Sequence, residues 1–77
     1  MKYLALFFTT TGSVKFKRKL KNMGKEAEML PVPRELSSSC GVAIRFQESE
    51  DVSALIDNTV EKVYTESEKG YLLFYSS

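Results

Sequence analysis

A loop at residues 31–41 holds the side chains best suited to chemistry. Its sequence, PVPRELSSSCG, contains both prolines, three consecutive serines and Cys40, the one cysteine in the 77-residue chain. A cysteine thiolate is a strong nucleophile, and a nearby cation such as Arg34 lowers the pKa of the thiol. Hydroxyl and backbone N–H groups of residues 38–41 could also stabilise a sulfur anion. The alternative is that Cys40 is a small apolar side chain, buried where a strand begins.

Several kinds of active site are excluded by the composition. The chain has no histidine and no second cysteine. It therefore cannot form a histidine-assisted nucleophile, an internal disulfide or a zinc site built on several thiolates. Glu48, Glu50 and Asp51 lack the spacing of a calcium-binding loop and are typical of the start of a helix. We expect a protein that is not an enzyme and that binds neither a metal nor an organic cofactor.

The second distinctive feature is a basic segment at residues 15–21. It contains five cations, Lys15, Lys17, Arg18, Lys19 and Lys21. A basic surface can bind phosphate or nucleic acid, but no nucleic-acid-binding motif accompanies this one. A solvated helix face, or one that docks on an acidic protein, fits the sequence better. We expect docking through Lys15, Arg18, Lys19 and Lys21, with no nucleic-acid partner.

The first half of the chain predicts a strand, a helix and a second strand. Residues 3–8 are all apolar, which is typical of a strand covered on both faces. A helix then begins at Thr11 or Ser13 and is closed by Gly24. Its narrow apolar stripe consists of Phe16, Leu20 and Met23. The strand at residues 26–32 should lie at a sheet edge or end at its prolines, because proline cannot donate to a ladder.

The second half of the chain predicts a strand, a helix and two further strands. Apolar and other residues alternate over residues 42–46, as in a half-buried strand. Ser49 can cap a second helix, whose buried face comprises Val52, Leu55, Ile56 and Thr59. Residues 60–65 and 71–75 then form strands joined by a turn at residues 66–70.

This order predicts an α+β fold in one domain, residues 1–77. The succession β-α-β-β-α-β is that of a ferredoxin-like two-layer sandwich, here with an extra C-terminal hairpin strand. A chain of this length holds a single core. Two helices cover one face of such a sheet, yet the first and last strands are apolar on both faces. We therefore expect the open face to meet another chain, most simply in a homodimer.

The opening apolar run carries no targeting information. It is six residues long, too short to span a bilayer, and it lacks both a charged leader and a small-residue cleavage site. We expect a soluble cytoplasmic protein without a membrane partner, in a compartment where a thiol stays reduced.

Residues 30–46, LPVPRELSSSCGVAIRF, resemble the signature of a small family of selenium/sulfur carrier-like proteins. The resemblance is carried by a Pro-x-Pro-Arg turn and a Ser-Ser-Cys-Gly loop, here Pro31, Pro33, Arg34, Ser38, Ser39, Cys40 and Gly41. The opening strand and the helix before the motif also fit the family pattern. The better-known Cys-Pro-x-Pro sulfur carriers differ, because the cysteine here follows the prolines.

The resemblance implies that Cys40 holds sulfur or selenium as a persulfide or selenopersulfide. Donor and acceptor proteins would then be its partners, and Arg34 would stabilise the charged sulfur. The alternative is a non-catalytic dimeric regulatory or adaptor module in which Cys40 is structural. A third hypothesis, an anion- or nucleic-acid-binding module, would use the basic segment at residues 15–21.

Overall fold

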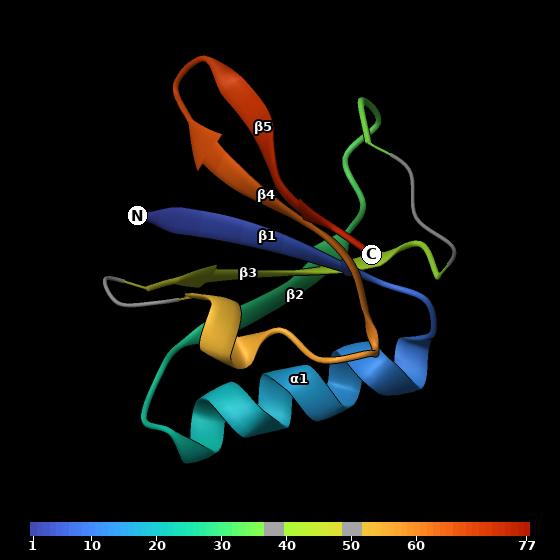
Figure 1. Cartoon of the computed structure of the whole chain (residues 1–77), viewed down its shortest axis with the longest axis vertical. Helices are drawn as coiled ribbons and strands as arrows, with labels where there is room; N and C mark the ends of the chain where they lie inside the picture. The colour runs from blue at the N-terminus through green and yellow to red at the C-terminus, as the bar shows by residue number, and fades with distance from the viewer. Residues whose placement is uncertain (37–39, 49–51) are drawn as a thin grey trace.

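One helix packs along a five-stranded antiparallel sheet in the computed structural model (Figure 1). The structure describes residues 1–36, 40–48 and 52–77. Its elements are β1 (Lys2–Phe7), α1 (Thr10–Asn22), β2 (Ala27–Pro31), β3 (Val42–Gln47), η1 (Val52–Leu55), β4 (Val60–Ser67) and β5 (Gly70–Ser76).

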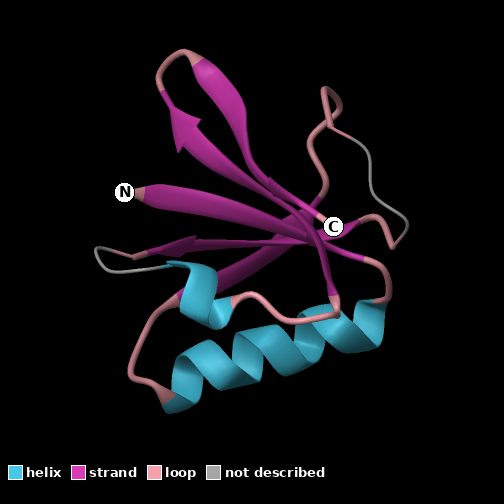
Figure 2. Cartoon of the chain, in the orientation of Figure 1, coloured by secondary structure: helices cyan, strands magenta, loops and turns pink. Residues whose placement is uncertain are grey.

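The strands lie in the order β2-β3-β1-β4-β5, and every neighbouring pair is antiparallel. The predicted positions are confirmed: the proline-bearing strand β2 is at one edge, β1 and β3 are interior, and β5 forms a hairpin with β4 (Figure 2). The chain is therefore a small α+β protein whose strand order is consistent with a ferredoxin-like fold.

The predicted second helix is wrong. A single 3₁₀ turn, η1, takes its place, and the predicted cap Ser49 lies outside the described residues. The cause lies just beyond η1, where the Asp57 carboxylate accepts hydrogen bonds from both the backbone N–H and the hydroxyl of Thr59. Such local bonds favour a turn over a helix. The chain consequently enters β4 at Val60, although Val52 and Leu55 are buried as expected.

The boundaries of α1 differ slightly from those predicted. Thr9, rather than Thr11 or Ser13, caps the helix, and its Oγ1 accepts a hydrogen bond from Gly12 N at 3.0 Å. Gly24 ends the helix in a left-handed conformation, as predicted. Met23 is exposed rather than buried, because it is the C-cap residue and the chain has already begun to leave the helix there.

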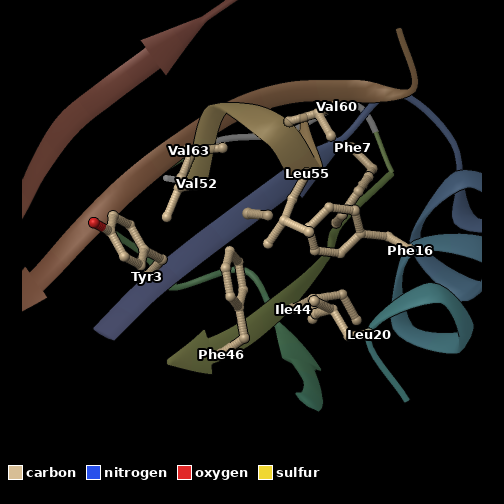
Figure 3. Packing of buried hydrophobic residues seen from close by; sticks show 11 residues of the cluster. Tyr3, Phe7, Phe16, Leu20, Ile44, Phe46, Val52, Leu55, Val60 and Val63 are labelled. Atoms are coloured by element: carbon tan, nitrogen blue, oxygen red, sulfur yellow. The ribbon is translucent and has the colours of Figure 1, made fainter. Parts of the chain in front are cut away.

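The main core lies between α1, η1 and the sheet (Figure 3). β1 contributes every second residue to it, as the two-residue period of a strand requires. Aromatic rings form its centre, with Phe16 of α1 against Phe7 of β1 and Phe46 of β3 at centroid distances of 5.1 and 5.5 Å. This packing fixes the helix along the sheet.

On the opposite face of the sheet, side chains of β1 and β3 are covered within the same chain. Leu4, Leu6 and Ala43 are fully buried there. Their cover is provided by partly buried side chains from β2, the following loop, β4 and β5, namely Leu30, Val32, Leu36, Tyr64 and Tyr71. The prediction that β1 needs another chain to cover this face is therefore wrong, and the burial of β1 gives the predicted homodimer no support.

Apolar surface is instead exposed on the edge strand β5. Leu72, Leu73 and Phe74 are 69%, 57% and 45% exposed. The pairing of β5 with β4 shifts register between Val63 and Tyr64, so that β5 carries one additional residue at this point, a β-bulge. Among the described residues, no helix is long and apolar enough to cross a membrane.

Candidate functional site

Cys40 lies at the base of the loop between β2 and β3. Pro31 pairs with Val42 at the end of the ladder, and one residue further out Val32 N donates a hydrogen bond to Gly41 O at 3.2 Å. The two ends of the loop are therefore tied together beside Cys40. The sheet positions the cysteine, which does not lie at the tip of a free loop.

The thiol of Cys40 is half-buried, with one side packed on the main core. Its Sγ donates a hydrogen bond to Val42 O at 3.3 Å. This bond requires the proton on sulfur, because a thiolate has no hydrogen to donate and meets the carbonyl lone pairs instead. Nucleophilic chemistry at Cys40 therefore requires that the proton leave and that the Sγ turn from Val42 O.

Gly41 supplies the backbone conformation that leads from Cys40 into β3. Its φ of +72° lies in the left-handed region, where a Cβ is strained. No atom lies within 4 Å of the position that a Cβ would occupy, so the requirement for glycine arises from the backbone alone. The turn at Gly41 thus sets the direction in which Cys40 is presented.

The remaining predicted loop residues are placed differently. Pro33 is half-buried and begins a turn in which Leu36 N donates to Pro33 O at 3.0 Å. Arg34 is exposed on this turn, within the same loop as Cys40. Ser38 and Ser39 lie outside the described residues, so the hydroxyl and N–H donors expected from them stay a prediction.

This loop returns to β3 at the end of the sheet where β1 leads into α1 (Figure 1). Leu6, near the end of β1, pairs with Ala43 near the start of β3. The thiol is thus at the same end of the molecule as the first turn of the helix. Within residues 1–36, 40–48 and 52–77, no group of three or more His, Cys, Asp or Glu side chains is arranged to hold a metal.

The predicted docking residues of α1 differ in exposure. Lys15, Arg18 and Lys21 are exposed. Lys19 is half-buried, and its Nζ donates a hydrogen bond to Leu55 O at 3.2 Å, which ties the helix to η1. Lys19 therefore contributes to the structure.

A basic hollow at the other end of the sheet was not foreseen from the sequence. It has a volume of about 880 Å³ and is lined by ten residues, Lys2, Lys17, Lys21, Lys25, Glu26, Ala27, Glu28, Arg45, Phe46 and Gln47. These residues come from β1, α1, β2, β3 and the α1–β2 connection. Lys17 and Lys21 belong to the basic segment at residues 15–21, but only the strand order brings them together with Lys2 and Arg45.

A family comparison supports the resemblance to the carrier-like family. Residues 2–72 match the family described as "Putative Se/S carrier protein-like", and the chain belongs to this family. The match spans every element except the last residues of β5. No curated protein and no solved structure matches the chain.

Proposed function

We propose that this protein carries activated sulfur or selenium on Cys40 and passes it to an acceptor protein. The observation that carries the proposal is a single half-buried thiol held at a fixed point of the sheet, in a member of the Se/S carrier-like family. A carrier needs one nucleophilic sulfur and access for two partners in turn. Such a role requires a reducing compartment such as the cytoplasm, because an oxidised thiol cannot accept sulfur.

The transfer is an exchange without net oxidation or reduction. After losing its proton, Cys40 Sγ attacks the outer sulfur of a donor persulfide, forming a new S–S bond as the old one breaks. The donor leaves as a thiolate and takes up a proton. An acceptor nucleophile then attacks the outer sulfur, and Cys40 departs as a thiolate; a selenopersulfide follows the same steps.

The lack of a second cysteine favours a carrier role for Cys40 rather than a role in disulfide formation. A resolving cysteine in the same chain would expel the bound sulfur by forming a disulfide. This sequence has none, so sulfur on Cys40 must leave to another molecule. Exposed Arg34, in the same loop, is the cation best placed by sequence to attract a charged persulfide.

Intact-mass analysis tests the proposal. The protein is incubated with a cysteine desulfurase and cysteine, and the expected result is a gain of one sulfur atom that a reductant removes. Cys40→Ser should show no gain while keeping the circular dichroism spectrum of the native fold. If the wild-type protein gains no sulfur from the desulfurase, or if the Cys40→Ser variant gains it equally, the proposal is wrong.

The alternative is a non-catalytic regulatory or adaptor module in which Cys40 is structural. The hydrogen bond from Sγ to Val42 O and the packing on the core favour this role. The alternative expects iodoacetamide to label Cys40 much more slowly in the native protein than in urea. Labelling at similar rates in both states argues against it and supports an accessible thiol.

A further inference from the structure

The loop chemistry leaves the basic hollow unexplained. Lys17 and Lys21 of α1 line it from the helix, four residues and thus one helical turn apart. Lys2 lines it from the start of β1, and Phe46 and Gln47 from the end of β3. The hollow is open to solvent at the sheet end opposite the Cys40 loop.

The cations of the hollow fall into two groups. Lys25 and Arg45 are engaged: Lys25 Nζ lies 2.8 Å from Glu48 Oε2, and Arg45 Nε lies 2.9 Å from Glu66 Oε1. A second carboxylate lies near the same guanidinium, with Arg45 Nη1 3.8 Å from Glu28 Oε2.

The second group consists of Lys2, Lys17 and Lys21. All three are exposed, and within the part of the chain that the structure describes they form no ion pair. These three cations therefore remain available to a ligand. The lining also includes two carboxylates, Glu26 and Glu28, and Glu28 lies near Arg45.

We propose that this hollow binds an acidic segment of a partner protein. The lysines are separated along a helix and a neighbouring strand, and each is a flexible point charge. That arrangement suits several carboxylates spread along a peptide. A compact phosphate is bound instead by backbone N–H groups at a helix N-terminus or by arginine forks. The helix end at this hollow is the C-terminal one, and Arg45 is already paired.

The position of the hollow is compatible with transfer at Cys40. From Val42, beside the cysteine, to Gln47, in the hollow, β3 spans about 17 Å. An acidic segment bound in the hollow therefore does not have to cover the thiol. A role for the hollow in docking a sulfur donor or acceptor rests on the proposed function. Binding of an acidic peptide to the hollow does not itself involve Cys40.

The test is a titration with a fluorescent, acetylated decaglutamate peptide, followed by fluorescence anisotropy at low salt. Lys17→Glu/Lys21→Glu reverses two charges that line the hollow. Lys15→Glu/Arg18→Glu is the matched control, because it makes the same charge change on the same helix outside the hollow. We expect the first pair to weaken binding roughly tenfold and the control pair by less than about threefold.

Three outcomes would overturn the proposal. Equal weakening by the two pairs would show attraction to overall charge, and binding that added salt does not weaken would exclude an ionic contact. Displacement of the peptide by an equal concentration of inorganic phosphate would identify the hollow as a phosphate site. Cys40→Ser should bind the peptide as the wild type does, so failure of sulfur loading with binding retained would reject only the carrier function.

Discussion

At the scale of single residues, the chemistry of Cys40 depends on two neighbours. Val42 O accepts the thiol hydrogen, and Gly41 turns the chain between them in a left-handed conformation. The Cys-Gly pair of the motif can therefore be explained physically. Gly41 sets the direction of the Cys40 side chain, and Val42 of the following strand accepts the hydrogen bond from the thiol.

Gly41→Ala should destabilise the protein by about 1 kcal/mol, because an L-residue is strained at positive φ. Urea unfolding followed by circular dichroism measures the change. Sulfur loading of Cys40 should fall as well if the direction of the thiol matters. Unchanged stability would show that the turn relaxes to another conformation without cost.

Asp57 predicts a dependence of stability on pH. Burial raises the pKa of its carboxyl, but the hydrogen bonds from Thr59 and the charge of Lys19 together outweigh burial and lower the pKa below 3.8. A group whose pKa is lower in the folded state stabilises the fold above its unfolded pKa. That contribution is lost as the pH falls through the folded pKa.

The matched variant is Asp57→Asn, which removes the charge and keeps the shape. The wild type should be the more stable of the two at pH 7, and the difference in unfolding free energy should shrink as the pH falls below about 4. Urea unfolding at a series of pH values measures it. A difference that stays constant with pH would contradict the assignment.

At the scale of elements, patterns of apolar residues predicted the strands well. β1, β3, β4 and β5 appear close to their expected bounds, and the prolines correctly place β2 at the edge. The prediction of a second helix was wrong because the apolar spacing at Val52, Leu55 and Ile56 fits a 3₁₀ turn as well as a helix. The competing signal was Asp57-Asn58-Thr59, whose side-chain bonds favour a turn.

The site was only partly predictable for a different reason. The motif located Cys40 and the loop, since those residues are adjacent in the sequence. The hydrogen bond from Sγ and the packing on the core depend on how the loop closes, which sequence does not specify. The basic hollow joins Lys2 to Lys21 across the fold, so its discovery required the strand order.

Leu6→Ala tests whether the face of the sheet away from α1 is a core of the single chain. Leu6 is fully buried there, so the truncation should cost about 3 kcal/mol in unfolding free energy. Leu72→Ala, at a side chain 69% exposed in β5, is the control and should change stability by less than about 0.5 kcal/mol. Equal effects of the two would show that Leu6 is not part of a closed core.

The ion pair between Lys25 and Glu48 should fasten the α1–β2 connection to the chain just after β3. Glu48 has a side chain only 5% exposed and lies 2.8 Å from Lys25 Nζ, so Glu48→Gln should cost about 2 kcal/mol. Glu28→Gln is the control, since Glu28 is 66% exposed and 3.8 Å from Arg45. Thermal unfolding compares them, and a larger loss from the control would contradict the prediction.

At the scale of the whole molecule, the predicted homodimer can be located more narrowly. β1 is already covered on both faces within the chain, so we expect association to use apolar side chains that remain exposed, and β5 carries three large ones. Leu72→Lys should lower association at high concentration while leaving the unfolding free energy within about 0.5 kcal/mol of wild type. Sedimentation velocity over a concentration series measures this. A wild type that stays monomeric throughout would dispose of the homodimer.

The bulge in β5 bears on how far such association can proceed. An edge strand with a regular backbone is a template on which further strands can add one after another, as in a growing fibre. The extra residue near Phe74 interrupts that regular spacing on the edge where the apolar side chains are exposed. We therefore expect the irregularity to hinder the addition of further strands at this apolar edge.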